Sequence, residues 1–317
     1  MSKTCPSVPA ASRLAKIGIT VFERGWLSSN NVLVKGAEST ALVDSGYCTH
    51  SGQTVALVKD ALQTRSLDML LNTHLHSDHC GGNAALQAAF PRLRTWIPPG
   101  HATAVASWDP VTLTHEPTGQ TCPPFKFQDL LVPGETIHLG DFGWEVHAAK
   151  GHDPHSVILF EPTSRTLISA DALWENGFGV VFPELEGLDA FEEVADTLSL
   201  IEALNPNTVI PGHGAVFENV EAALRRARSR LDQFVQSPEK HQRYALKVLI
   251  KFKLLEWQSI SFEDLLAWYV STPYIGSIEK RTVPSSPGDL RRTLNSLLAE
   301  LATSNALRVE GNRIIDI

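Results

Sequence analysis

Residues 73–79 read Thr73-His74-Leu75-His76-Ser77-Asp78-His79, and this stretch carries the strongest chemical signal in the chain. Its three imidazoles and one carboxylate would be crowded and desolvated if nothing bound them. Imidazole nitrogen and carboxylate oxygen are ligands that zinc accepts at about 2.0–2.2 Å. The apolar run Met69-Leu70-Leu71 predicts a buried strand just before the stretch, and Gly81-Gly82 leads into a predicted helix. The stretch is therefore predicted to be a metal-binding loop at the end of a strand.

Three later segments offer the same residue types. Gly151-His152-Asp153-Pro154-His155-Ser156 follows a predicted strand that ends at Ala148. Asp171 ends a predicted strand over 167–170, and Pro211-Gly212-His213-Gly214 follows the strand Val209-Ile210. All three segments lie at the C-terminal ends of predicted strands, as the first stretch does. We therefore expect one site with the ligands His74, His76, Asp78, His79, His152, Asp171 and His213.

These motifs, T-H-x-H-x-D-H, G-H, a later Asp and P-G-H-G in this order, resemble those of the metallo-β-lactamase superfamily. The resemblance covers the first two-thirds of the chain and is closest to the glyoxalase II-like branch. It implies one metal ion held by His74, His76 and His152. It implies a second ion held by Asp78, His79 and His213, with Asp171 bridging the two. The implied cofactors are two Zn²⁺ ions, with Fe or Mn as substitutes.

Differences from other branches of the superfamily narrow the expected activity and the expected metal. Asp171 stands where the best-known β-lactamases carry a cysteine, which disfavours antibiotic hydrolysis. His76 stands where flavodiiron oxygen reductases carry a glutamate, which favours zinc over a redox iron pair. Asp44 resembles the supporting aspartate of the family. Cys80 directly follows His79 and is expected to be a small buried residue rather than a ligand.

The predicted fold class is α/β. Strand patterns alternate with helical patterns before Phe217, which predicts sheets covered by helices. The resemblance makes this an αββα sandwich of two mixed sheets covered by helices, and we assign residues 1–236 to this catalytic domain. Residues 237–317 are predicted to form a winged-helix domain. Its expected parts are helices over 244–256, from Ser261 onward and over 289–301, and a hairpin across Gly311-Asn312.

The C-terminal domain leaves an alternative function open. It resembles the domain attached to lactamase-β-like hydrolases, which include an animal mitochondrial endoribonuclease, so a phosphodiesterase or endoribonuclease remains a candidate. The arginines that could contact phosphates are Arg281, Arg291, Arg292, Arg308 and Arg313. Acidic residues are interspersed among them and no basic stripe emerges. A cap, a pocket wall or a contact in a homodimer is therefore the favoured role of the domain.

The expected activity follows from the implied metal pair. A hydroxide that bridges two zinc ions would attack a small ester or acyl-thioester, since bound zinc lowers the pKa of water to about 7. Asp78 is the expected catalytic residue because its carboxylate can accept a hydrogen bond from the hydroxide and aim it. The aromatic loop 173–183 follows Asp171 and predicts an apolar pocket wall, although the same aromatics could pack the core. The candidate pocket residues are Trp174, Phe178, Phe182 and His155.

Composition and net charge argue against some of the other possible partners and locations of the protein. The net charge of −8 argues against a nucleic-acid-coating protein, and nucleic acid is an unlikely partner beside a small-molecule substrate. The four cysteines form no C-x-x-C pair, which is typical of a reducing compartment. Neither an apolar signal segment nor a membrane-length apolar run is present, so a cytoplasmic location without a membrane partner is expected. A regulatory protein that retains the metal site without catalysis is the third alternative.

Overall fold

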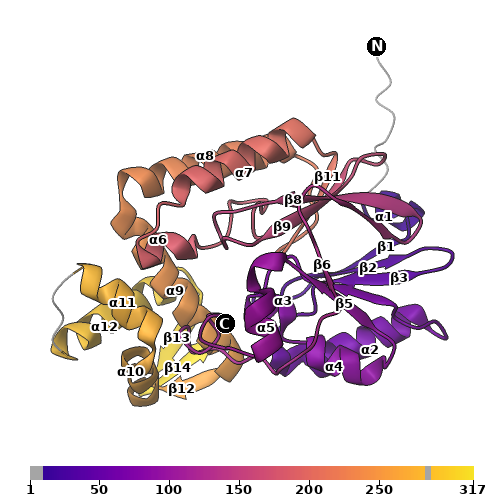
Figure 1. Ribbon diagram of the computed structural model, residues 1–317. Coiled ribbons are helices and arrows are strands. Elements are labelled where there is room, and N and C mark those ends of the chain that lie inside the picture. Colours follow the sequence, from indigo (N-terminus) through magenta and orange to yellow (C-terminus); the bar gives the residue numbers. More distant parts are fainter. Residues whose placement is uncertain (1–9, 283–286) are drawn as a thin grey trace, which may run out of the picture.

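Two β-sheets packed face to face form the centre of the molecule in a computed structural model that describes residues 10–282 and 287–317 (Figure 1). The first sheet runs in chain order through β1 (Ile19–Phe22), β2 (Asn31–Lys35), β3 (Thr40–Val43), β4 (Met69–Leu71), β5 (Arg94–Ile97) and β6 (Asp129–Leu130). Strands β1 to β3 are antiparallel, whereas β3 to β6 are parallel. The first sheet is therefore mixed, as predicted.

The second sheet has the order β11-β10-β9-β8-β7. Its strands are β7 (Thr136–Leu139), β8 (Phe142–Ala148), β9 (Val157–Glu161), β10 (Thr166–Ala170) and β11 (Thr208–Pro211). Only β10 and β11 pair in parallel, and the other neighbours in this sheet are antiparallel. The directions of β8, β10 and β11 are consequently the same, so their C-terminal ends lie at one edge of the sheet.

Both faces of each sheet are covered, so the inner strands β3, β9 and β10 are buried along their whole length. Along β2, Val32 and Val34 point into the core between the sheets, and Leu33 points to the helices outside. Helices α2 (Ser51–Leu62) and α4 (Asn83–Ala89) cover the first sheet, and α7 (Phe191–Leu204) and α8 (Val220–Gln236) cover the second (Figure 1). The predicted α/β sandwich of two mixed sheets covered by helices is confirmed.

The C-terminal residues form a helical unit with a small sheet beside the sandwich (Figure 1). It contains α9 (Pro238–Trp257), β12 (Ser259–Ser261), α10 (Phe262–Ser271), α11 (Pro273–Thr282), α12 (Pro287–Thr303), β13 (Leu307–Glu310) and β14 (Arg313–Asp316). The expected helices and hairpin are present, while α11 and β12 were not expected. As predicted, Ser261 caps α10, accepting from the backbone N–H of Asp264 at 3.1 Å.

Ser237 separates α8 from α9, at the position where the sequence predicts the boundary between the two units. The apolar cluster of the C-terminal unit also includes Val180 and Leu185 from the sandwich, so the two units share a packed contact. The domain division at 236/237 and the winged-helix assignment stay predictions. Arg281 lies outside the residues whose side chains the structure describes.

Short helices and one long segment complete the fold. The short helices are α1 (Ala10–Lys16), η1 (Cys48–His50), α3 (Ser77–Cys80), η2 (Pro99–His101), α5 (Ala102–Ser107) and α6 (Phe182–Glu186). Residues 108–128, between α5 and β6, contain neither helix nor strand. Across the described ranges 10–282 and 287–317, no helix combines the length and the apolar run that crossing a bilayer requires.

Candidate metal centre

The predicted ligands meet where strands of both sheets end. The first motif follows β4, and the short helix α3 begins immediately after His76 and carries Asp78 and His79. The other ligands follow β8, β10 and β11, whose C-terminal ends share one edge. The described residues that could hold a metal ion include two neighbouring groups made only of predicted ligands: His74, His76 and His152, and Asp78, His79, Asp171 and His213.

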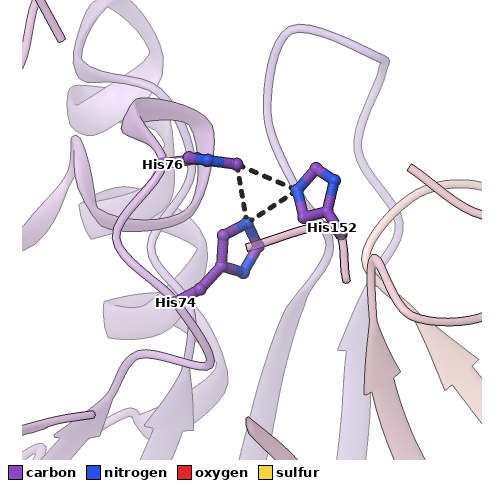
Figure 2. Close-up of side chains that lie close together, drawn as sticks. All are labelled: His74, His76 and His152. Atoms are coloured by element: carbon purple, nitrogen blue, oxygen red, sulfur yellow. Dashed lines mark hydrogen bonds between the residues drawn. The ribbon is translucent and has the colours of Figure 1, made fainter. Parts of the chain in front are cut away.

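The three imidazoles of the first group point toward one another (Figure 2). Nδ1 of His76 lies 3.1 Å from Nε2 of His74 and 2.9 Å from Nε2 of His152. The Nε2 atoms of His74 and His152 are 3.3 Å apart. Nitrogens bound to one tetrahedral zinc ion at about 2.0–2.1 Å lie roughly 3.3 Å from each other. The three nitrogens are therefore spaced for a single small cation.

Hydrogen bonds on the far sides of the rings fix which nitrogen faces the site. Nδ1 of His152 donates to the carbonyl oxygen of Val180 at 2.6 Å, which leaves Nε2 as the free lone pair. Nδ1 of His79 donates to Oδ2 of Asp44 at 2.8 Å, with the same result. A histidine that binds a metal usually donates its other ring N–H to a carbonyl or carboxylate in this way.

The second group contains both carboxylates. Nε2 of His213 lies 3.1 Å from Oδ2 of Asp78, and Nε2 of His79 lies 3.5 Å from Oδ1 of Asp171. The four ligand atoms lie within 4.8 Å of one another. This donor set of two imidazoles and two carboxylates is one that zinc binds.

Asp171 faces both groups. Its Oδ1 points to His79 in the second group, and its Oδ2 lies 3.4 Å from Nε2 of His152 in the first. The neighbouring backbone leaves room for this carboxylate only because residue 212 is glycine, since a Cβ atom on Gly212 would overlap Oδ1 of Asp171. One carboxylate with an oxygen toward each group is the arrangement that a bridging ligand needs.

Asp44 supports the site from behind. It is 3% exposed, and its backbone adopts a φ of 59°, a left-handed conformation that aspartate tolerates better than most residues. Its carboxylate accepts from the backbone N–H of Thr73 at 2.9 Å and from the Thr73 hydroxyl at 2.8 Å. It also accepts the hydrogen bond from His79, so the side chain of Asp44 holds both Thr73 and His79, the two ends of the motif.

The electrostatics favour the cation-binding form of His74, His76 and Asp171. Burial, together with the neighbouring imidazoles, lowers the pKa of His74 well below its usual value and that of His76 to about 3. Burial alone would raise the pKa of Asp171, but the imidazoles of His213 and His79 hold it well below the usual range. Neutral imidazoles and ionised carboxylates are the ligating forms.

At His79, neighbouring carboxylates outweigh burial in setting the pKa. This environment shows whether a metal ion would fit beside the residue. Burial alone would lower its pKa, but the carboxylates of Asp44, Asp171 and Asp78 raise it well above the usual value. Its Nε2 is buried and has no hydrogen-bond partner among the described residues. A cation beside that nitrogen would satisfy it and offset the surrounding carboxylates, so the residues present fit a metal pair.

The groups open into a cavity whose enclosed volume is about 90 Å³. Five of the predicted ligands line this cavity: His76, Asp78, His152, Asp171 and His213. The rest of the wall is mainly apolar or hydroxylic: Trp26, Thr114, Thr118, Gln120, Trp174, Gly179, Val180, Phe182, Tyr244, Val248, Leu249 and Phe252. A ligand in the cavity would touch the candidate metals on one side and mostly apolar side chains on the other.

The candidate pocket residues divide into two pairs. Trp174 and Phe182 line the cavity, and the ring of Phe182 packs edge-on against His76. Phe178 and His155 do not line it, which corrects our expectation. Phe178 is 1% exposed and packs in the core against Phe234 of α8. His155 lies over Gly100 and contacts the ring of His101, so it belongs to the outer side of its loop.

Several cavity residues carry no signal in the sequence. Trp26 stacks on the ring of His213 with a centroid distance of 5.3 Å and packs edge-on against Trp174. It lies in a loop, where no motif or periodic pattern marks it in the sequence. Tyr244, Val248 and Phe252 come from α9 of the C-terminal unit. Their four-residue spacing indicates that they share one face of a helix. From sequence alone, such an apolar face would be assigned to the core of its own domain. The C-terminal unit thus supplies a wall of the cavity.

An α/β sandwich with two groups of histidine and aspartate at its strand ends defines a class of metal-binding proteins. The family model described as the Metallo-beta-lactamase superfamily matches residues 24–213. The matched span exceeds half of the chain and contains all seven predicted ligands. The chain belongs to the metallo-β-lactamase superfamily.

Relatives and solved structures agree with this assignment. The chain is 33% identical over 159 residues to a hydroxyacylglutathione hydrolase of Rhodobacter capsulatus, covering 50% of this chain and 52% of that one. It is 24% identical over 199 residues to an atrochrysone carboxyl ACP thioesterase of Aspergillus fumigatus, covering 63% of this chain and 54% of that one. The chain thus spans about half the length of these curated relatives.

A solved structure is similar over nearly its whole length. A metallo-beta-lactamase family protein from Thermus thermophilus superimposes with a TM-score of 0.55 at 16% identity. The match covers 95% of this chain and 99% of that chain. At this identity the likeness concerns the fold alone.

Proposed function

We propose that the chain is a dinuclear zinc hydrolase that acts on a small ester or acyl-thioester. The observation that carries this proposal is the split carboxylate of Asp171, which turns one oxygen to each group of ligands. His74, His76 and His152 would hold one ion, and Asp78, His79 and His213 the other. The ligand set contains nitrogen and oxygen only, which suits zinc and also admits iron or manganese as substitutes.

When bound, two zinc ions supply a water-derived hydroxide near neutral pH and a Lewis acid for the carbonyl oxygen. The side chains decide how that chemistry is aimed. Asp78 lines the cavity, so its carboxylate can accept a hydrogen bond from the nucleophile as well as ligate. Trp26 and Trp174 cover the ring of His213 and limit access of bulk water from that side.

The walls of the cavity favour a substrate with an apolar arm. A second hollow of about 290 Å³ shares Trp26, Tyr244, Val248 and Phe252 with the first. We infer that the two hollows together form one mainly apolar channel beside the candidate ligands. Lys247 and Lys251 also line the second hollow, but they are paired with Glu300 and Asp316. An uncharged acyl chain fits this channel better than a polyanion. The names of two relatives, hydroxyacylglutathione hydrolase and atrochrysone carboxyl ACP thioesterase, support an acyl-thioester as the substrate.

The four candidate arginines whose side chains the structure describes give no support to the nuclease alternative. Arg291 pairs with Glu263, Arg292 with Asp289, and Arg308 with Glu310. Arg313 donates to the hydroxyl and the carbonyl of Ser259. Cations that already have acidic partners add little attraction for phosphate. We therefore favour a small-molecule substrate.

The test is a pair of assays on the zinc-loaded protein. A panel of acyl-thioesters and esters and a labelled single-stranded RNA are incubated with wild type, Asp171→Ala and the exposed control Asp189→Ala. We expect thioester or ester turnover in wild type and in Asp189→Ala, its loss in Asp171→Ala, and intact RNA throughout. RNA cleavage that depends on Asp171 would replace this proposal with the nuclease alternative. Zinc-loaded protein that turns over neither substrate class would favour a regulatory role.

A further inference from the structure

A third cluster of metal-ligand side chains lies next to the candidate centre and contains sulfur. Sγ of Cys80, Sγ of Cys122 and a ring nitrogen of His115 lie within 4.8 Å of one another. The three residues are 0%, 8% and 2% exposed, and both cysteines are free thiols. Cys80 is buried as the sequence predicts, but its neighbours are polar groups as well as apolar ones.

The two sulfur atoms are spaced as ligands of one ion. They lie 3.7 Å apart, well beyond a disulfide bond of about 2.05 Å. Two thiolates bound to a tetrahedral zinc ion at about 2.3 Å would be roughly 3.8 Å apart. Zinc would therefore fit between these sulfurs with almost no movement, whereas a disulfide would require them to approach.

His115 shows the same hydrogen-bond pattern as the ligands of the candidate centre. Its Nε2 donates to the carbonyl oxygen of Leu75 at 3.0 Å, which leaves Nδ1 with the lone pair. That Nδ1 is buried and has no hydrogen-bond partner among the described residues. A buried nitrogen without a partner costs free energy unless something binds it. The bond to a backbone carbonyl is typical of a metal-binding histidine.

The positions of the three residues suggest what an ion would do. Cys80 ends α3, which carries Asp78 and His79, whereas His115 and Cys122 belong to the segment 108–128. A segment of this length without helix or strand is uncommon in a compact domain unless something holds it. A metal ion that joins its middle and its end to α3 would supply that restraint.

We propose that Cys80, His115 and Cys122 bind a structural zinc ion, distinct from the candidate pair. Two thiolates balance the charge of Zn²⁺, so the complex is neutral, which suits a buried position. Thiolate and imidazole are ligands that zinc prefers, and a monovalent ion such as Cu⁺ would leave a buried negative charge. Cys122 is the most exposed of the three, so a water molecule can complete the tetrahedron from its side.

The ion would shape the substrate cavity without touching a substrate. Thr114, Thr118 and Gln120 of the same segment line the cavity. Gln120 accepts a hydrogen bond from Ser77 at the start of α3. The zinc ion would fix the segment at two points on either side of Gln120, and thereby hold this part of the wall against the candidate centre.

Cobalt substitution tests the proposal, because the candidate pair has no sulfur ligand. The full-length protein is stripped with a chelator under reducing conditions and titrated with Co²⁺ alone. We expect a thiolate-to-cobalt charge-transfer band in the near ultraviolet and one bound ion per chain beyond the pair. Zinc added afterwards should abolish the band. Cobalt spectra without such a band, or a disulfide between Cys80 and Cys122 in protein kept reduced, would overturn the proposal.

Two variants assign the band to the cluster. Cys122→Ala should lose the band and one ion per chain, while the ions of the candidate pair remain. Cys48→Ala is the matched control, because Cys48 is also a free cysteine but lies outside the cluster, so its spectrum should equal that of wild type. A band that persists in Cys122→Ala would refute the assignment. If Cys122→Ala does not fold, thiol labelling of wild type decides: zinc must protect Cys80 and Cys122, and their full labelling in zinc-loaded protein would refute the site.

Discussion

Oδ2 of Asp44 lies 2.8 Å from Nδ1 of His79, so a residue at the end of β3 orients a ligand carried by α3. The same carboxylate binds the backbone and the hydroxyl of Thr73, at the start of the motif. Both carboxylate oxygens of Asp44 thus accept hydrogen bonds from the motif. The ring orientation of His79 and the path of the chain into the motif depend on one buried charge.

Replacing Asp44 with asparagine tests this dependence. Asparagine tolerates the same left-handed backbone conformation, but its amide group would face donors where the carboxylate accepted. We expect zinc affinity to fall by roughly 10–100-fold, as for other outer-shell partners of ligating histidines. Competition with a chelator measures the affinity, and Asp60→Asn on the exposed side of α2 is the control. Unchanged affinity in Asp44→Asn would mean that the motif holds its own geometry.

Adding one methyl group at Gly212 should displace the carboxylate of Asp171, the proposed bridging ligand. In Gly212→Ala the new Cβ would overlap Oδ1 of Asp171, and Cε1 of His79 would be 3.0 Å away. We expect fewer zinc ions per chain by elemental analysis and at least a tenfold loss of hydrolysis, since ligand displacements of about 1 Å cost on the order of 100-fold in rate. Gly276→Ala in α11, where a Cβ meets nothing within 4 Å, should keep full metal content. It should also gain up to about 1 kcal/mol in stability.

Removing the indole of Trp26 should weaken substrate binding while leaving the fold intact. The side chain is 55% exposed but stacks on His213 and lines both hollows. We expect Trp26→Ala to raise KM for long-chain acyl substrates several-fold and to change KM for acetyl substrates little. Leu188→Ala, at a residue that is 57% exposed, is the control. An equal change in KM for all chain lengths would show that Trp26 does not contact the acyl chain.

Protein stability should decrease at acidic pH partly because of His241. Burial among aromatic rings lowers its pKa from 6.5 to about 4, and its Nε2 accepts from the backbone N–H of Val181 at 3.0 Å. The folded state therefore keeps His241 neutral, while the unfolded state binds a proton below pH 6.5. Stability from this residue is full above pH 6.5 and is lost progressively as the pH falls toward 4.

The expected loss over that range is on the order of 3 kcal/mol, at about 1.4 kcal/mol per pKa unit. Urea unfolding of wild type and His241→Gln across this pH range measures it. Glutamine keeps an acceptor for Val181 but does not titrate, and the other ionisable groups are common to both proteins. The difference in unfolding free energy between the two should shrink as the pH falls. A difference that is constant with pH would show that the imidazole titrates normally in the folded protein.

The parts of the site that could be predicted from sequence are those with a local pattern. The buried run before His74 and the glycine-flanked histidines at His152 and His213 signal both the strand and the ligand. Phe178 and Phe182 show the limit of sequence-based prediction. Phe178 lies in an irregular loop and faces the core, whereas Phe182, where the loop meets α6, faces the cavity. An irregular segment has no periodicity from which to infer a direction.

The rest of the site depends on packing between distant segments. Tyr244 and Val248 reach the cavity only because α9 packs beside the sandwich, which no spacing in the sequence specifies. The cluster of Cys80, His115 and Cys122 combines residues at irregular intervals and matches no spacing of known zinc motifs. Strand β6 spans only Asp129–Leu130, too short to alternate in a recognisable way.

The contact between Asp78 and His213 joins residues that lie 135 positions apart in the chain. During synthesis the first motif leaves the ribosome long before the turn after β11 exists. Under the proposed ligand assignment, a nascent chain would hold a metal ion only through part of its ligands, and neither ion would be fully enclosed until the second sheet had docked. Metal acquisition would then be a late event in biogenesis that follows the completion of the second sheet.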